Sequence, residues 1–244
     1  MTYLKERLQK LKEAQSEQVD LSGKSITIVT AGDDPASEVY VRQKVNVLTG
    51  FGATVNHIQM AIPTTQEELD AVVRNCNDTG ILVQLPLPDG LVCPSIPDHQ
   101  DVDGFNLTSK VLPCTAQACL DIMHSEVGSI EGLNVLVLGR SNIVGFPLAV
   151  ECIKQGATVT VGNSKSKWFR YEDFDIVVVA TGARAHYATE FIDVPLVIDV
   201  GIHRIEGKVV GDVIGSTGYS NITPVPGGVG PFTVLNVARN LVKL

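Results

Sequence analysis

NVLVLGRSNIVGFPLAVECIKQGATVTVGN, residues 134–163, carries the pattern that decides the fold. An apolar run at 134–140 leads into a helical stretch, and a second β-branched run follows at 157–163. Continuous runs of this kind are typical of strands buried on both faces of a parallel sheet. Pro147 and Gly156 are placed to open and close the helix between them. The stretch therefore predicts a strand–helix–strand unit.

The same alternation extends along the chain and predicts an α/β protein with parallel sheets. Helix-like stretches lie at 34–48 and 65–75, and the second begins with TTQEEL (64–69), in which Thr and Glu have capping-box spacing. A segment without clear periodicity, 104–115, marks a boundary between two α/β domains, the second of them Rossmann-like. We expect domains at 1–112 and 113–230, with the C-terminal helix 231–244 packing back on the first. The other expected strands are 25–32, 53–60, 80–88, 175–182 and 196–202.

Composition excludes several classes of protein. The chain has 244 residues and a net charge of −8, which gives it no electrostatic reason to bind nucleic acid or an anionic membrane. It contains no run of 18 apolar residues, and its charged N-terminal helix lacks a signal-peptide core. Five cysteines without a C-x-x-C pair favour reduced thiols in a cytoplasmic protein. The five histidines form no metal-ligand motif, so we expect no metal.

A nucleotide site is indicated where the first strand of the opening stretch ends. Gly139 permits a tight turn, and Gly145 allows close backbone approach at the start of a helix whose dipole favours a pyrophosphate. The spacing is not G-x-G-x-x-G, so a plain strand-to-helix turn is the alternative. The next strand ends VGNSKSK without an acidic residue for a ribose hydroxyl, whereas Arg140 and Ser164, with Lys165 and Lys167, suit a 2′-phosphate. This favours NADP over NAD, with a solvated basic turn as the alternative for the lysines.

A chemical site is indicated in the first half. Asp34 and Pro35 are placed to cap and open a helix on which Tyr40 and Lys44 share one face. A partly buried lysine beside an aromatic ring could hold a flat substrate and transfer a proton. The alternative is an exposed lysine that covers the ring. Gln84 ends a buried strand, where ligands bind in parallel sheets.

The loop DVDGF (101–105) carries two carboxylates, Asp101 and Asp103, beside Gly104. One carboxylate could pair with the amino and ring N–H groups of a pterin-like heterocycle. An Asx turn is the alternative.

Nine segments in order resemble the bifunctional methylenetetrahydrofolate dehydrogenase/cyclohydrolase family: YVRQK, ILVQLPLP, DVDGF, PCT, GRSNIVGFP, VVVATG, VIDVGI, KVVGDV and ITPVPGGVGPFT. The resemblance implies two α/β domains, the first catalytic and folate-binding and the second NADP-binding, with a cleft between them. It implies NADP-dependent oxidation of 5,10-methylenetetrahydrofolate to the 5,10-methenyl cation, then hydrolysis to 10-formyltetrahydrofolate. The resemblance thereby implies a place in one-carbon metabolism, with purine biosynthesis as the expected use of the product. It also implies a homodimer paired through the nucleotide domains.

The resemblance also implies roles for individual residues. Lys44 would be the central catalytic residue, chiefly for hydrolysis, and Gln84 would tune it. Tyr40 would stack on the folate, and Asp103 would anchor the pterin. The residues implied to bind the cofactor are Gly139, Arg140, Ser141, Val144, Gly145, Ser164, Thr181, Gly182, Gly201 and Ile202.

The segment TPVPGGVGP (223–231) concentrates three prolines and three glycines. We expect the prolines to stiffen a loop and its glycines to remove side chains where folate and nicotinamide meet, since hydride transfer needs roughly 3–3.5 Å between the reacting carbons. Pro226, Gly227 and Gly228 are therefore expected to contact the substrate, and Pro231 to start the last helix.

Two rival interpretations remain open at this point. One is a two-domain oxidoreductase for another substrate, such as shikimate or an amino acid, which would not need the PVPGGVGP loop. The other is a divergent non-catalytic or monofunctional paralogue that binds folate or nucleotide. It is favoured by the shortened loops, whereas the retained Tyr40, Lys44, Gln84 and Asp103 argue against it. PCTAQAC and Asn163, which replace the family's usual residues, bear on cofactor preference and efficiency more than on the reaction class.

Overall fold

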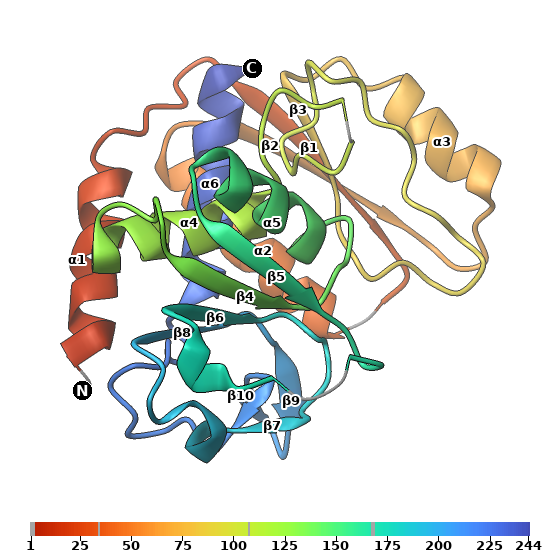
Figure 1. The fold of residues 1–244 in the computed structure, drawn as a ribbon. Helices are drawn as coiled ribbons and strands as arrows, with labels where there is room; N and C mark the ends of the chain where they lie inside the picture. Colours follow the sequence, from red (N-terminus) through yellow and green to blue (C-terminus); the bar gives the residue numbers. More distant parts are fainter. Residues whose placement is uncertain (1–2, 34, 107, 167–168) are drawn as a thin grey trace. The chain divides into compact units, whose positions relative to one another are not determined.

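The computed structural model describes residues 3–33, 35–106, 108–166 and 169–244 and contains two compact units. We call Met1–Glu17 with Pro113–Thr233 the four-stranded unit, and Gln18–Leu112 with Val234–Leu244 the three-stranded unit. Each is built on a parallel sheet accompanied by helices (Figure 1). This confirms the predicted α/β class with parallel sheets.

The three-stranded sheet has the order β2–β1–β3, formed by Ser25–Ala31 (β1), Thr54–Met60 (β2) and Gly80–Val83 (β3). β1 and β3 are almost entirely buried, as their β-branched runs predict, whereas the edge strand β2 is mostly exposed. β3 stops at Val83 instead of reaching residue 88. Pro86 and Pro88 have no backbone N–H with which to continue a ladder, so the prediction of a longer strand was wrong.

Two helices connect these strands, α2 (Pro35–Gly50) and α3 (Gln66–Arg74). α2 begins at Pro35 as expected, while the proposed cap Asp34 lies outside the described residues. The capping box of α3 is present: the Thr65 hydroxyl accepts from the Glu68 N–H, and the Glu68 carboxylate accepts from the Thr65 N–H.

The four-stranded sheet has the order β5–β4–β6–β8 and is parallel throughout. Its strands are Asn134–Leu138 (β4), Thr158–Gly162 (β5), Ile176–Val179 (β6) and Leu196–Asp199 (β8). The order reverses between β4 and β6, and in open α/β sheets ligands bind at the carboxyl ends of the strands at such a point. The loops that follow β4 and β6 are therefore the expected ligand-binding loops of this sheet.

The helices of this unit differ in detail from the expected ones. α5 (Gly145–Lys154) begins two residues before Pro147, and Gly156 follows its end with a positive φ of 85°. α6 (Val229–Lys243) begins before Pro231, so the expectation that this proline starts the helix was wrong. Short elements replace full helices between the later strands: η1 (Tyr171–Asp173), β7 (His186–Tyr187), η2 (Ala188–Phe191), β9 (His203–Ile205), β10 (Lys208–Val210) and β11 (Val213–Ile214).

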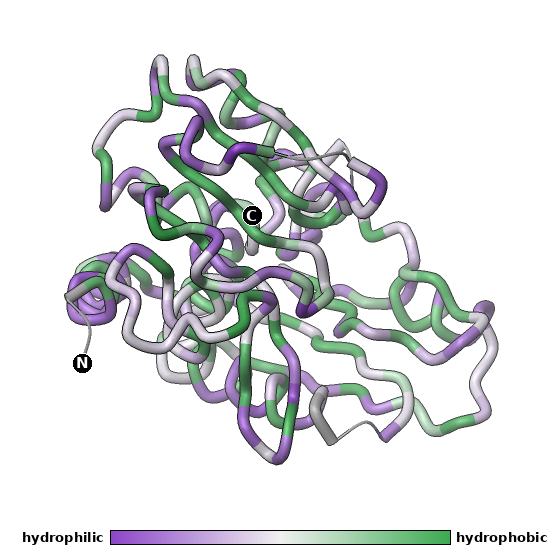
Figure 2. The backbone as a smooth tube through the Cα atoms, turned by 60° about the horizontal axis from the view of Figure 1, so that its bottom comes forward, coloured by the Kyte–Doolittle hydropathy of each residue, from purple (hydrophilic) through white to green (hydrophobic). Residues whose placement is uncertain are grey.

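The chain's ends are grouped differently from the expected domains 1–112 and 113–230. Helix α1 (Tyr3–Ser16) belongs to the four-stranded unit, where it meets α4 (Cys114–Val127). Arg7 donates to the Ser125 carbonyl at 2.9 Å and approaches the Glu126 carboxylate at 3.3 Å. Figure 2 shows α1 as a largely hydrophilic coil with some hydrophobic residues beside the N label. Its buried Leu4 and Leu8 explain why it packs there. Within the three-stranded unit, Asn240 of α6 donates to the Val102 carbonyl at 3.0 Å.

Candidate active site and cofactor site

Lys44 and Gln84 form the centre of the candidate active site. Lys44 is only 8% exposed, and its Nζ donates to Gln84 Oε1 at 3.0 Å. Gln84 immediately follows β3; its backbone N–H donates to the Val29 carbonyl at 2.8 Å, and its Nε2 donates to the Leu85 carbonyl at 2.6 Å. The amide is thus held with its oxygen toward the lysine. This arrangement excludes the alternative of an exposed surface lysine.

The neighbours of Lys44 leave its amine available for proton transfer. In the part of the chain that the structure describes, no carboxylate forms an ion pair with Lys44. A neutral amide oxygen accepts a hydrogen bond from either the amine or the ammonium, so Gln84 does not lock the charged form. Tyr40 lies one helical turn earlier on α2 and is half-buried.

The two aspartates of the DVDGF loop have different surroundings. The buried carboxylate of Asp101 accepts from the N–H groups of Gly104 at 2.9 Å, Phe105 at 3.3 Å and Asn106 at 2.9 Å. Burial raises the pKa of Asp101, and these three bonds oppose the rise. Asp101 is therefore the turn-forming residue.

Asp103 is 5% exposed, and none of the described residues donates a hydrogen bond to its carboxylate. Buried carboxylates normally have hydrogen-bond partners. Asp103 thus offers an acceptor that a ligand could use, which distinguishes it from Asp101.

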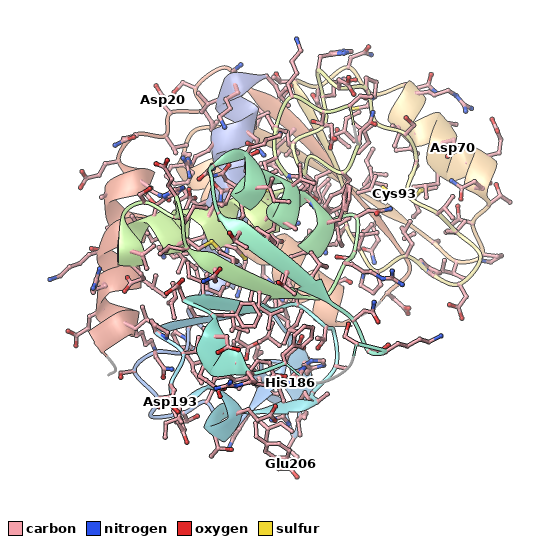
Figure 3. The ribbon with its side chains drawn as sticks, viewed as in Figure 1. Asp20, Asp70, Cys93, His186, Asp193 and Glu206 are labelled. Carbon is pink, nitrogen blue, oxygen red and sulfur yellow. The ribbon has the colours of Figure 1, made fainter. Side chains whose placement is uncertain are left out.

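The charge of this carboxylate acts on the thiol of Cys93, a link that sequence reasoning did not identify. Burial raises the pKa of the Cys93 thiol to about 11, with further contributions from the negative charges of Asp103 and Asp101. Figure 3 labels Cys93 in the loop that follows β3. No motif in the sequence links residue 93 to residue 103, so only the folded chain reveals the pair.

A small cavity of about 20 Å³ adjoins Gln84 at the carboxyl ends of the three strands, enough for one water molecule. Thr30 and His57, which line it, are joined by a hydrogen bond of 3.0 Å between Oγ1 and Nε2. Gln59, Ser37 and Pro86 also line the cavity. The site therefore includes polar groups beyond the residues that the motifs indicate.

The glycines after β4 are needed for close packing. Gly139 has a φ of 120°, and a Cβ there would overlap the carbonyl oxygen of Ala180. A Cβ on Gly145 would overlap the carbonyl oxygen of Gly139. The Phe146 N–H already donates to the Ser141 carbonyl at 3.0 Å, so the first turn of α5 is not fully open to an anion. Val144 is the N-cap residue of α5.

The loop after β5 presents an exposed basic and polar surface. Asn163 organises it: its side-chain oxygen accepts from the Lys165 N–H at 2.8 Å, and its N–H donates to Ser166 Oγ at 2.9 Å. Ser164, Lys165 and Arg140 are exposed, and Lys167 lies outside the described residues. An exposed hydroxyl and guanidinium fit a 2′-phosphate.

A buried carboxylate, Asp212, joins the loops that carry four of the predicted cofactor residues. Its Oδ2 accepts from the Thr181 N–H at 2.8 Å, the Thr181 hydroxyl at 2.9 Å and the Gly182 N–H at 2.9 Å. Its Oδ1 lies 2.7 Å from His203 Nε2. A Cβ on Gly201 would overlap Oδ1, which explains the glycine beside Ile202.

Asp199 fixes Asp212 in turn. Its carboxylate accepts from the N–H groups of Gly201 at 3.0 Å, Asp212 at 2.9 Å and Val213 at 3.0 Å. Burial raises the pKa of Asp199, and these bonds oppose the rise. Sequence reasoning missed both aspartates as site residues. The signal available was an Asp at the end of one buried run, in VIDVG, and another within VVGDV.

The glycines of the PVPGGVGP loop differ in what a side chain at each position would meet. A Cβ on Gly228 would lie 2.5 Å from the Pro224 carbonyl oxygen, whereas one on Gly230 would meet nothing within 4 Å. Gly227 has a φ of 105°. Gly228 is therefore required by the loop itself, and its replacement by valine would disturb the loop. Pro226 is exposed beside it.

Within the described ranges, no group of three or more His, Cys, Asp or Glu side chains could hold a metal ion. In the same part of the chain, every helix is too short or too polar to cross a membrane.

Comparisons with known proteins identify the family. The model of the catalytic domain of tetrahydrofolate dehydrogenase/cyclohydrolase matches residues 2–103, and the model of its NAD(P)-binding domain matches residues 113–244. The bifunctional protein FolD of Erythrobacter litoralis is 37% identical over 245 residues, which cover 88% of this chain and 82% of that protein.

Solved structures agree in fold. The crystal structure of FolD from Campylobacter jejuni has a TM-score of 0.79 and 34% identity, and the match covers 98% of this chain and 93% of that one. The Trypanosoma brucei dehydrogenase-cyclohydrolase, complexed with NADP and an inhibitor, has a TM-score of 0.81 and 27% identity, with coverage of 96% and 93%.

These matches confirm the predicted family, its dehydrogenase and cyclohydrolase activities, the NADP cofactor and the Rossmann-like second domain. They give no support to a non-catalytic paralogue. The chain belongs to the tetrahydrofolate dehydrogenase/cyclohydrolase family.

Proposed function

We propose that this chain oxidises 5,10-methylenetetrahydrofolate with NADP and hydrolyses the resulting 5,10-methenyl cation to 10-formyltetrahydrofolate, with Lys44 as the proton-transferring residue. The observation that carries the proposal is the buried Lys44 Nζ held 3.0 Å from Gln84 Oε1. A buried lysine without a carboxylate partner is rare in a purely structural role, because burial of an unpaired charge is costly.

The oxidation step asks little of the side chains. The bound NADP would supply the acceptor for the hydride that leaves the methylene carbon, and the folate nitrogens N5 and N10 would stabilise the resulting cation. The protein must therefore position the folate rather than supply an acid. Tyr40 would stack on the folate, and the available acceptor of Asp103 would hold the amino and ring N–H groups of the pterin.

The hydrolysis step needs proton transfer. Water adds to the methenyl carbon, the bond from this carbon to N5 breaks, and the formyl group stays on N10. Lys44 would accept one proton from the adding water and return it to N5 as the bond breaks, and the second water proton would leave to solvent as the formyl carbonyl forms. Gln84 would orient the amine without fixing its charge, and it is itself held by the Leu85 carbonyl.

The cofactor would be bound by the loops that follow β4, β5, β6 and β8. Arg140 and Ser164 would contact the 2′-phosphate, since both are exposed and the end of β5 carries no carboxylate for a ribose hydroxyl. The other residues proposed to bind NADP are Gly139, Ser141, Val144, Gly145, Thr181, Gly182, Gly201 and Ile202. Pro226, Gly227 and Gly228 would contact the folate.

A homodimer paired through the four-stranded units is supported by an exposed apolar surface. Phe146 and Ile153 on α5 and Val161 on β5 are 52%, 58% and 43% exposed. α5 packs against β5, so these side chains belong to one region.

The free cysteines fit a cytoplasmic enzyme. The 10-formyltetrahydrofolate that the enzyme forms would serve formyl transfer in purine biosynthesis.

A direct assay tests the proposed reactions. The purified chain is mixed with 5,10-methylenetetrahydrofolate and either NADP or NAD, reduced cofactor is followed by absorbance, and the folate products are separated. We expect turnover with NADP, weaker turnover with NAD and conversion of the methenyl product to 10-formyltetrahydrofolate. A folded protein without turnover would contradict the proposal. Accumulation of the methenyl product would contradict the proposed hydrolysis step.

A further inference from the structure

His203 contributes to the cofactor loops through Asp212. It opens β9, and its side chain is 24% exposed, whereas the Asp212 side chain is completely buried. Since an ionised carboxylate only accepts hydrogen bonds, His203 Nε2 must be the donor in its 2.7 Å contact with Asp212 Oδ1. Among the residues that the structure describes, no other donor reaches this oxygen.

The bond to His203 ensures that each of the two carboxylate oxygens of Asp212 has a hydrogen-bond donor. Oδ2 holds the Thr181 and Gly182 N–H groups, and Oδ1 is held by His203. A buried carboxylate oxygen without a donor is unfavourable, so the group would rotate to find another donor. Rotation would weaken the hydrogen bonds that Oδ2 accepts from the loop after β6. Thr181 and Gly182 are exposed even though their N–H groups point at Asp212.

We propose that His203 is a positioning residue for NADP binding, acting through Asp212 on the loop at Thr181 and Gly182 and on the adjacent turn at Gly201. This inference rests on the proposed function, which assigns these loops to the cofactor. His203 itself need not touch NADP. Its effect is to keep two loops, joined by one carboxylate, in a single arrangement before the cofactor arrives.

The test is a titration of NADP into the full-length protein and its variants, with the dissociation constant read by calorimetry. In His203→Ala we expect the dissociation constant to rise about tenfold, the effect of removing a hydrogen bond to a charged group. His203→Gln places an amide donor at similar reach and should restore most of the affinity. In the dehydrogenase assay, His203→Ala should raise the KM for NADP while kcat and the KM for the folate stay unchanged.

His186→Ala is the matched control. His186, labelled in Figure 3, approaches the Glu190 carboxylate at 3.5 Å in the same unit, but among the described residues neither side chain bonds to a proposed cofactor loop. This variant should bind NADP as the wild type does. Equal NADP affinity in His203→Ala and wild type would overturn the inference, and so would equal weakening in His203→Ala, His203→Gln and His186→Ala.

Two further results keep the inference separate from the function on which it rests. If His203→Ala does not fold, His203→Met, which lacks a donor but fills the space, is compared with His203→Gln. Weaker NADP binding in the Met variant supports the inference, and equal binding overturns it. If the wild type itself does not bind NADP, the proposed function fails first and the inference falls with it.

Discussion

The thiol of Cys93 provides a chemical test of the carboxylate at Asp103. The pKa of Cys93 is raised from 9.0 to about 11, chiefly by burial and then by Asp103 and Asp101. Since the thiolate is the reactive form, this shift lowers reactivity at pH 8 by about 100-fold relative to an unperturbed thiol. Asp103→Asn removes one negative charge with little change of shape. We expect the pKa of the Cys93 thiol to fall, because the charge of Asp103 contributes to its rise, and alkylation to become faster by about threefold or more.

The assay is alkylation by iodoacetamide at pH 8, followed by mass spectrometry in a Cys76→Ser background. Cys76 and Cys93 are the partly exposed cysteines, and the other three are buried. Asp98→Asn is the control, because it removes a charge from the same loop without being among the causes of the Cys93 shift. If Cys93 in a folded Asp103→Asn protein is alkylated at the same rate as in the Asp98→Asn control, the reasoning is refuted. The charge of Asp103 would then not act on Cys93.

Three other variants test separate parts of the structure. Arg140→Ala should raise the KM for NADP about tenfold and leave the KM for NAD unchanged, because only NADP carries the 2′-phosphate. Steady-state kinetics with both cofactors test this, and an equal rise of both KM values would show that the assignment is wrong. Gly139→Ala should lower the free energy of unfolding by at least about 2 kcal/mol, because its φ is positive and a Cβ would overlap the Ala180 carbonyl; an unchanged urea midpoint would contradict this. Thr65→Ala should cost about 1 kcal/mol in the same measurement, since it removes the capping-box bond to Glu68, and no loss would show that α3 does not depend on its cap.

Much of the fold could be predicted because periodicity and burial follow from local sequence. The β-branched runs became the parallel strands, and TTQEEL became a capped helix start. Boundaries were less predictable. α5 begins at Gly145 and α6 at Val229, in each case two residues before the proline that was expected to open the helix. Proline is tolerated throughout the first turn, so its position does not fix the first residue.

The candidate site was predictable in its residue types but not in its connections. Tyr40 and Lys44 follow from helical spacing, whereas the 3.0 Å contact between Lys44 and Gln84 joins residues that are 40 positions apart. Asp212 was missed because its partners, Thr181 and His203, lie 31 and 9 positions away on other loops. A buried carboxylate that accepts hydrogen bonds from several loops can be recognised only in the folded structure.

The ratio of the two activities in Lys44→Met tests the central claim most directly. Methionine fills the space of the lysine stem but cannot transfer a proton or donate to Gln84. Because proton transfer by a positioned side chain contributes about 10²-fold or more, we predict a loss of at least about 100-fold in methenyl hydrolysis, with measurable dehydrogenase activity retained. Unchanged hydrolysis by a folded Lys44→Met protein would contradict the assignment of proton transfer to the buried lysine.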